Sequence, residues 1–311
     1  MAKDLESLTE SRKKRAEFKA KFGLIPESIM KHDHADKGLD IVVGNKGRAY
    51  GDTGTLIKKD RFKDYDSRLA ADSFSISGRS VRAGALSRFF QNIGRFFVEF
   101  YCPEGGTVYD PFAGHNSRMG LTHSCNRHYI GVDVSSNFME ANREIRKAIL
   151  SASQSGFLSN DCSIKLYERS SADVPEVPNG TADYTITSPP YWDLEYYGDE
   201  PEQLGNAKTF PSFMEHLTEH IRENHRILKP GSYCSWFIND FVKDKVFYCY
   251  HAALIKAFTD VGFVLHDITV IDLGYSLGTA FLQTILKTKR FAKKHEYACT
   301  FKKMEAHGGK E

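Results

Sequence analysis

Several signals that assign a chain to a common class are missing from these 311 residues. The six cysteines never reach CxxC spacing, so the sequence predicts neither a structural zinc site nor a disulfide framework. No apolar run approaches the ~20 residues that span a bilayer, and the charged N-terminus lacks the apolar core of a secretory signal. We therefore expect a cytoplasmic protein with no membrane partner and no metal.

An excess of charge of one sign is also missing. The chain carries 42 Lys and Arg against 40 Asp and Glu, which gives a formal net charge of +2. This balance excludes a protein that holds a polyanion by bulk charge alone, but a local basic stripe can still bind phosphate. With 41% hydrophobic and 26% charged residues, the composition is that of an ordinary soluble globular protein.

Hydrophobic periodicity divides the chain into three expected regions. Residues 1–79 form an N-terminal extension, in which a charged helix over 1–22 precedes a stretch without a sustained period. This extension is a candidate recognition segment. Residues 80–305 form one large domain, and residues 306–311 form a flexible tail. The first helix of the domain is expected to present an aromatic face from Leu86 to Phe100.

Strands and helices alternate across that domain. The expected strands cover residues 107–110, 129–133, 182–187, 233–238, 263–271 and 297–301. Helices are expected from about 118, from about 135, over 211–228, and over 246–261 with Gly262 as the stop. The alternation predicts an α/β fold with a mixed, mostly parallel sheet, helices on both faces and a C-terminal antiparallel strand pair.

Ligands of open α/β sheets bind at the carboxyl ends of the strands, and three strands here end distinctively. The first runs into Asp110 and a turn with Gly114 and Asn116, where a ligand can approach backbone N–H groups. This turn has neither the GxGxxG dinucleotide fingerprint nor the P-loop Gly-Lys-Ser/Thr. The second strand ends in Asp133, where a carboxylate can accept both hydroxyls of a ribose. A tight structural turn and a helix-capping or surface acid are the alternatives.

The third strand ends in Ser188-Pro189-Pro190-Tyr191-Trp192. Two prolines fix the backbone and remove two N–H donors, which leaves carbonyl acceptors beside a hydroxyl and flat aromatic rings. This combination suits recognition of a planar amine. A rigid turn with a packed aromatic side chain is the structural alternative.

Together the three endings DPFAGHNSR, GVDV and TSPPYW resemble the S-adenosylmethionine-dependent amino-methyltransferases of DNA, which methylate N4 of cytosine or N6 of adenine. The resemblance covers roughly residues 80–301, and the longer run TSPPYWDLEYYGDEPEQL is similar to orphan enzymes of phages and prophages. It implies a Rossmann-like methyltransferase fold, S-adenosylmethionine as the cofactor and double-stranded DNA as the partner. It also implies base flipping, and a setting of DNA methylation or restriction-modification in a bacterial or phage-infected cell.

The resemblance also assigns residues to roles. Catalysis falls to Ser188, Pro189, Pro190 and Tyr191. Cofactor binding falls to Asp110, Phe112, Ala113, Gly114, Asn116 and Asp133, to Ser170 and Asp173 near the place of the family's adenine-binding acid, and to Ser87 before the first strand. Asn116 stands where the family usually has Gly, and Ser170 where it usually has Asp. These two departures predict weaker cofactor binding.

Nucleic-acid contacts are assigned to Trp192 and to five basic residues: Lys287, Lys289, Arg290, Lys293 and Lys294. They belong to the segment 287–303, which carries seven Lys and Arg against one Glu, and the runs 12–15 and 58–63 are further candidates. The recognition element is expected to be dispersed over residues 1–80 and 273–294, in a monomer or a homodimer.

The base that is methylated is left open between two choices. Within the family the Ser-Pro-Pro form favours N4 of cytosine over N6 of adenine. An RNA base remains an alternative substrate, and a catalytically weak DNA-binding homologue is a further alternative. Protein-glutamine methyltransferases resemble Asn-Pro-Pro-Tyr at this turn, so Ser188 counts against them.

Overall fold

A computed structural model of the chain describes residues 2–22, 26–31, 89, 91–114, 117–154, 161–194, 200–273 and 282–305. The strands are β1 Ile29–Lys31, β2 Thr107–Asp110, β3 His128–Asp133, β4 Ile164–Glu168, β5 Ala182–Thr187, β6 Leu228–Ile238, β7 Phe241–Lys243, β8 Val246–Tyr248, β9 Phe263–Asp272 and β10 His295–Lys303. The helices are α1 Ala2–Phe22, α3 Gln91–Tyr101, α4 Ser117–Ser124, α5 Ser136–Gln154, the 3-10 turn η1 Leu204–Asn206, α6 Phe210–Ile227, α7 Tyr250–Val261 and α8 Leu282–Thr288.

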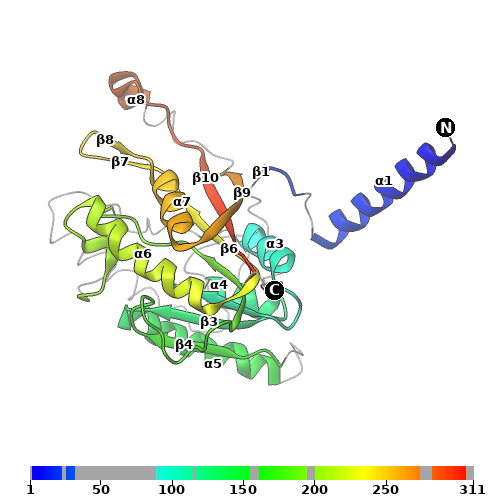
Figure 1. The fold of residues 1–311 in the computed structure, drawn as a ribbon, viewed down its shortest axis with the longest axis horizontal. Coiled ribbons are helices and arrows are strands. Elements are labelled where there is room, and N and C mark those ends of the chain that lie inside the picture. Colours follow the sequence, from blue (N-terminus) through cyan, green and yellow to red (C-terminus); the bar gives the residue numbers. More distant parts are fainter. Residues whose placement is uncertain are drawn as a thin grey trace, which may run out of the picture.

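Eight of the strands form one sheet in the order β1-β9-β10-β6-β5-β2-β3-β4 (Figure 1). Neighbouring strands are parallel except at β10, which pairs antiparallel with both β6 and β9. The chain winds from β2 to one side through β3 and β4, and then returns through β5 to the other side. This is the doubly wound Rossmann-like arrangement that the sequence predicted, with the expected antiparallel pair at its C-terminal end.

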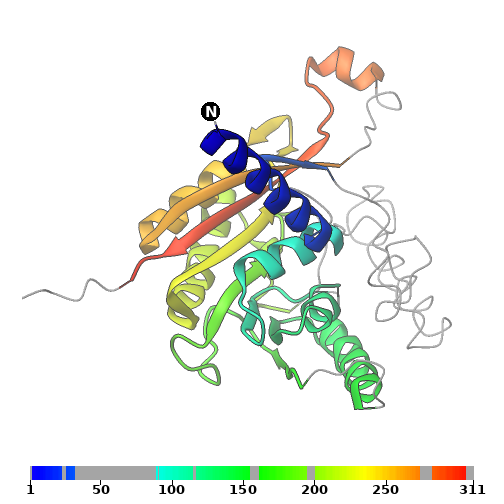
Figure 2. The same cartoon turned by 90° about the vertical axis from the view of Figure 1, so that its right-hand side faces the viewer.

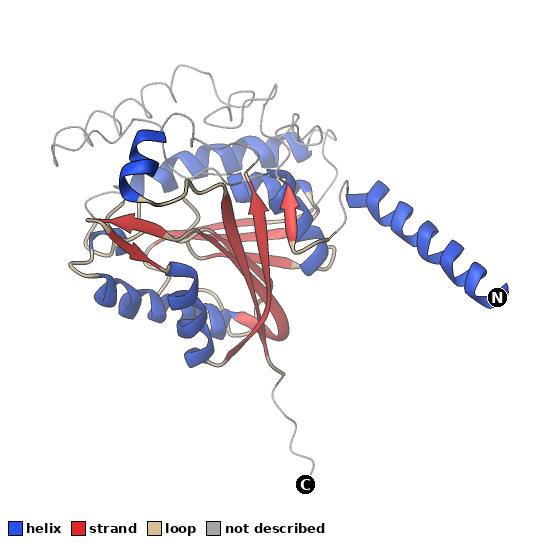
Figure 3. Cartoon of the chain, turned by 90° about the horizontal axis from the view of Figure 1, so that it is seen from above, coloured by secondary structure: helices blue, strands red, loops and turns tan. Residues whose placement is uncertain are grey.

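Helices cover both faces of the sheet (Figure 3). The face with α3, α4 and α5 is packed by aromatic and aliphatic side chains such as Phe97, Leu121 and Ile145. The opposite face is packed by α6 and α7, with Phe213 and Phe258 fully buried. These apolar faces follow the 3.6-residue period of each helix, which is why the helices could be predicted from sequence.

A β-hairpin replaces the start of one predicted helix. The helix expected over residues 246–261 begins at Tyr250, and residues 246–248 instead pair with β7. Asp244 and Lys245 join the two strands at φ of 48° and 68°, the left-handed conformations that a two-residue hairpin turn requires. The prediction failed because a short apolar run such as Val-Phe-Tyr fits a strand as well as a helix.

The other differences concern the edges of elements. Strand β6 begins at Leu228 rather than near 233, because Pro230 and Gly231 are accommodated by a register shift against β5 instead of ending the strand. Helix α3 begins at Gln91, later than the aromatic pattern suggested, and the stop at Gly262 is confirmed by its left-handed φ of 107°. Strands β1 and β4 were not expected.

The N-terminal helix is confirmed as α1. Its Phe18 ring lies 6.3 Å from the ring centroids of Phe96 and Phe100, so α1 contacts the outer side of α3. Figure 1 shows the C-terminal end of α1 near α3 and the rest of the helix extending away, and the two helices overlap in the view of Figure 2. No helix in the described part of the chain combines the length and apolarity needed to cross a membrane.

Candidate functional site

The candidate site lies where the strand order reverses. Strands β2 and β5 are neighbours in the sheet, although β3, β4 and α5 separate them in the chain. Their carboxyl ends carry the two turns singled out from the sequence, residues 110–114 after β2 and residues 188–192 after β5. Ligands of doubly wound sheets bind in the crevice at such a switch point.

The carboxylate of Asp110 connects the two turns. It is fully buried, and its Oδ1 accepts a hydrogen bond of 2.7 Å from the Thr187 hydroxyl at the end of β5. Its Oδ2 accepts from Arg118 Nε at 2.7 Å and from the Tyr129 hydroxyl at 2.8 Å. Burial raises the pKa of Tyr129 well above its usual value, so that hydroxyl stays protonated and donates. A buried carboxylate with three donors is a rigid anchor rather than an open ligand group.

Both backbone groups of Gly114 are held by hydrogen bonds to side chains. Its N–H donates to Asp133 Oδ2 at 2.8 Å, and its carbonyl accepts from Asn142 Nδ2 of α5 at 2.8 Å. Gly114 has φ of 47°, and among the described residues an added Cβ would meet nothing closer than the Phe112 carbonyl at 3.8 Å. One side of the turn therefore has room for a ligand close to the backbone.

Asp133 has a second backbone partner. Its Oδ1 accepts from the Ser135 N–H at 2.9 Å, so each carboxylate oxygen holds one amide. Burial raises the pKa of Asp133 to about 6, against the opposing effect of the two amides. At pH 7 the group is mostly ionised, and each oxygen keeps a lone pair that can accept a hydroxyl.

The two residues expected near the cofactor's adenine, Ser170 and Asp173, do not point toward one shared binding position. Ser170 Oγ accepts a bond of 3.3 Å from the Ala172 N–H, and the Asp173 side chain is 79% exposed beside Arg169. The buried polar pair here is Ser171 with His220, at 2.7 Å. Burial lowers the pKa of His220 to about 4, so the ring is neutral at pH 7. The bond to Ser171 makes His220 a hydrogen-bonded core group.

The turn after β5 packs its aromatic side chains inward. Tyr191 and Trp192 are each about 8% exposed. The Tyr191 ring lies 5.8 Å from that of Tyr250, whose hydroxyl donates to the Pro190 carbonyl at 3.3 Å. The Trp192 indole N–H donates to the Ala207 carbonyl at 2.8 Å, and the Lys243 ammonium lies 4.3 Å from its ring centroid. A base that stacks on Trp192 would therefore have to displace Lys243.

The predicted basic segment enters at the same edge of the sheet. The antiparallel pairing of β9 with β10 brings Asp272 opposite His295, so the connection between them starts and ends beside the carboxyl end of β6. Within it Lys293 Nζ donates to the Asn239 amide oxygen at 3.2 Å, and Lys294 lies 3.6 Å from the Asp272 carboxylate.

The other predicted basic residues lie further out along this connection. Arg290 Nη2 donates to the Lys245 carbonyl in the hairpin turn, and Lys287 and Lys289 are exposed at the end of α8. The connection is therefore attached to the edge through Arg290, Lys293 and Lys294.

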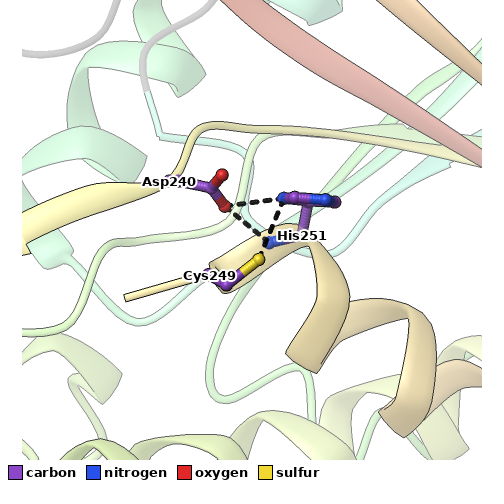
Figure 4. A group of neighbouring side chains, drawn as sticks. All are labelled: Asp240, Cys249 and His251. Atoms are coloured by element: carbon purple, nitrogen blue, oxygen red, sulfur yellow. Dashed lines mark hydrogen bonds and ion pairs between the residues drawn. The ribbon is translucent and has the colours of Figure 1, made fainter. Parts of the chain in front are cut away.

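A group of possible metal ligands lies at the end of β6 (Figure 4). Asp240 Oδ1 accepts hydrogen bonds from His251 Nδ1 at 2.7 Å and from the His251 backbone N–H at 3.1 Å. Cys249 Sγ lies 3.6 Å from the same ring nitrogen. Because Lys293 Nζ lies 3.9 Å from Asp240 Oδ2, a positive charge already occupies this neighbourhood. The arrangement serves to hold the first turn of α7.

Some functional residues were missed or lie outside the described part. Arg118 and Asn142 donate hydrogen bonds to the backbone carbonyls of the turn. In the sequence, the only sign of this role is that they follow shortly after a strand end. Glu296 of β10 is a buried carboxyl near Arg118, and burial raises its pKa to about 7. Ser87, Asn116 and the run 58–63 lie outside the described residues.

Comparisons with known proteins give a partial match. No protein-family profile matches the chain. The curated Type II methyltransferase M.XycI from Xanthomonas campestris pv. cyanopsidis is 42% identical over 52 residues, which make up 17% of this chain and 17% of that protein. The chain thus matches about a sixth of the length of this relative.

Two solved structures resemble the chain at low identity. A SAM-dependent methyltransferase from Methanosarcina mazei matches with a TM-score of 0.43 and 13% identity, over 68% of this chain and 98% of that one. A candidate DNA modification methylase from Thermus thermophilus matches with a TM-score of 0.31 and 18% identity, over 43% of this chain and 50% of that one.

Proposed function

We propose that the chain transfers a methyl group from S-adenosylmethionine to the exocyclic amine of a base in DNA, with N4 of cytosine as the favoured target. The observation that carries the proposal is the hydrogen bond between Thr187 and Asp110. It holds the Gly114 turn beside the Ser188 turn at the switch point, where a cofactor and an amine would have to meet.

The residues around the Gly114 turn fit the cofactor. A ribose needs two acceptors for its hydroxyls, and Asp133 retains acceptor capacity on both oxygens while its amide partners hold it still. The space beside Gly114 suits close approach of a ligand to the backbone. When bound, S-adenosylmethionine supplies a methyl group that its sulfonium already activates.

The Ser188 turn would raise the nucleophilicity of the amine. The lone pair of an aryl amine is delocalised into the ring, and accepting its hydrogens on the Ser188 hydroxyl and the Pro189 carbonyl favours a pyramidal nitrogen. The Pro190 carbonyl already accepts from Tyr250, which supports Pro189 as the second acceptor. Transfer would then be an in-line displacement: the nitrogen–methyl bond forms as the sulfur–methyl bond breaks, S-adenosylhomocysteine leaves, and the extra proton on the nitrogen passes to solvent.

Duplex DNA would have to release the target base. Extrusion costs a few kcal/mol of unstacking, and stacking of the base on Tyr191 would return ~1–3 kcal/mol once that 8% exposed ring is uncovered. We assign the catalytic domain to residues 80–305 and phosphate contacts to the segment 287–294. An N6-adenine or RNA target remains compatible with the same chemistry.

A second candidate is a DNA-binding homologue with little turnover. It is favoured by Ser170, which stands in place of an acid, and by the outward position of Asp173 beside Arg169. Weak cofactor binding would follow, because the adenine would lack a carboxylate partner. Measuring cofactor affinity and methyl transfer separately distinguishes this candidate from a working enzyme.

The test is nucleoside mass spectrometry of DNA from cells that express the chain. The control is the same cells expressing Ser188→Ala at equal level. We expect N4-methylcytosine in the first sample and its loss in the second. N6-methyladenine alone would correct the target base, and the absence of any methylated nucleoside in DNA would refute the proposal.

A further inference from the structure

The β7–β8 hairpin presents an apolar face away from the catalytic turn. Its inner residues Phe241 and Tyr248 stack at 5.1 Å and pack against the aromatic rings of residues 191–192. Val242 and Phe247 are directly opposed across the two strands, and they are 41% and 50% exposed. The hairpin is thus anchored on one face and open on the other.

Phe291 belongs to a segment that is attached to this hairpin. It is 96% exposed, in the connection between α8 and β10. The residues around it are attached to the hairpin: Arg290 donates to the Lys245 carbonyl, and the Lys293 ammonium lies 5.0 Å from the ring centroid of Phe247. Phe247 and Val242 thus form an exposed apolar patch, and Phe291 is an exposed aromatic ring on the segment attached to that hairpin; we call these three residues the wedge surface.

The wedge surface lies on the catalytic side of the sheet. The hairpin follows the carboxyl end of β6, and the connection 273–294 leaves β9 and enters β10 at the same edge. In Figures 1 and 2, α8 lies beyond this end of β10, and Figure 1 shows the hairpin at the same end of the molecule. An aromatic ring is thus exposed at the same edge of the sheet as the turn of residues 188–192.

We propose that the wedge surface contacts the base stack of duplex DNA next to the extruded nucleotide, with Phe291 occupying the gap that this nucleotide leaves. The inference rests on the proposed function and adds to it a residue that enables extrusion. An extruded base leaves its neighbours without a stacking partner, and an aromatic side chain can replace that partner. Apolar side chains inserted between base steps serve this purpose in DNA-bending proteins.

The charge around Phe291 favours DNA over a protein partner. Residues 287–294 carry five Lys and Arg and no acid; Lys293 and Lys294 lie beside Asp240 and Asp272, while Lys287 and Lys289 are exposed. Phosphates flank every base step, so basic residues on both sides of an aromatic ring match a duplex. The core of a protein–protein interface, in contrast, is depleted in Lys.

The test compares Phe291→Ala and Phe291→Trp with the parental chain. Val264→Ala is the matched control, because Val264 is 48% exposed at the amino end of β9, on the opposite edge of the sheet. The first arm measures labelled methyl incorporation into unmethylated genomic DNA, and sequencing identifies the modified site. The second arm uses two synthetic duplexes with that site, one fully paired and one with an abasic residue opposite the target base.

We expect Phe291→Ala to lose about tenfold or more of the rate on paired DNA, and to recover to within about twofold on the abasic duplex, where little pairing remains to be broken. Phe291→Trp and Val264→Ala should retain the parental rate on both. A Phe291→Ala rate equal to the parental rate on paired DNA, or equally reduced on both duplexes, would overturn the wedge.

Two further outcomes overturn it differently. If Phe291→Ala keeps its activity but lowers the native mass of the protein, the surface is an interface with a second copy of the chain. If the parental chain methylates no DNA in the first arm, the proposed function fails, and the wedge fails with it for that separate reason.

Discussion

The Thr187 hydroxyl donates a hydrogen bond to the Asp110 carboxylate across two neighbouring strands, with 2.7 Å between the oxygens. Thr187 directly precedes the turn proposed to be catalytic, and Asp110 directly precedes the turn proposed to hold the cofactor. The bond is fully buried at both ends, so water cannot replace it. It therefore sets the distance between the two halves of the proposed site.

Replacing Thr187 with Val removes this bond while keeping the shape of the side chain. Losing one donor to a buried carboxylate should cost about 1–3 kcal/mol of unfolding free energy, measured by urea denaturation. Because the two turns are no longer joined, we also expect the rate of methyl transfer to fall by about tenfold or more.

Thr185→Val is the matched control for that variant. The Thr185 hydroxyl is also buried in β5 and donates to Asn224 at 2.7 Å, but it does not contact either turn. It should lose similar stability and keep the parental rate per folded molecule. Equal losses of rate in the two variants would show that Thr187 acts only through stability.

Ser188→Ala tests the proposed acceptor of the amine hydrogen. The variant should bind S-adenosylmethionine with parental affinity by calorimetry and lose at least about a hundredfold in methyl transfer. Ser124→Ala, which removes a hydroxyl bonded to the Leu121 carbonyl at the end of α4, should change neither quantity. Parental transfer by Ser188→Ala would remove Ser188 from the mechanism.

The strand ends could be predicted because their signals are local. A run of apolar residues followed by Asp110, Asp133 or Ser188 fixes both the strand and the edge at which it ends. The partners of those residues could not be predicted. Whether Asp110 bonds to Arg118, and Gly114 to Asn142, depends on how α4 and α5 pack after the turn. Hydrophobic periodicity in the sequence does not contain this information.

The hairpin was missed for a related reason. Three apolar residues at 246–248 do not distinguish a strand from the start of a helix, and the Asp-Lys turn lacks the glycine that usually marks a hairpin. Because the hairpin was not predicted, the covering of the Trp192 ring by Tyr248 and Lys243 could not be predicted either. The DNA contact assigned to Trp192 stays a prediction.

Asp133→Asn tests the cofactor-binding carboxylate. Asn can accept one of the two amide hydrogens now bound by Asp133, but its own NH₂ group would face the other amide. We expect the affinity for S-adenosylmethionine to fall by about tenfold or more, measured by calorimetry. Parental affinity in this variant would exclude Asp133 from the cofactor site.

The pH dependence of binding should follow the same group. Burial raises the pKa of Asp133 to about 6, so the carboxylate needed for ribose binding is lost as the pH falls below about 6, and affinity should then weaken. The effect of Asp133 on the free energy of unfolding changes with pH in the opposite direction. A raised pKa means that ionisation costs stability above pH 6, so this contribution improves as the pH falls. Asp133→Asn should lack this pH dependence of binding, and a dependence equal to the parental one would point to another group.

The exposed lysines at the end of α8 should set part of the salt dependence of DNA binding. If Lys287 and Lys289 each neutralise one phosphate, the double variant Lys287→Gln/Lys289→Gln should lower the slope of log affinity against log salt by about 2, measured by fluorescence anisotropy. Lys256→Gln is the control, because its 75% exposed side chain pairs with Asp260 on α7. An unchanged slope in the double variant would mean that bound DNA does not reach α8, and phosphate contacts would then have to come from other basic residues.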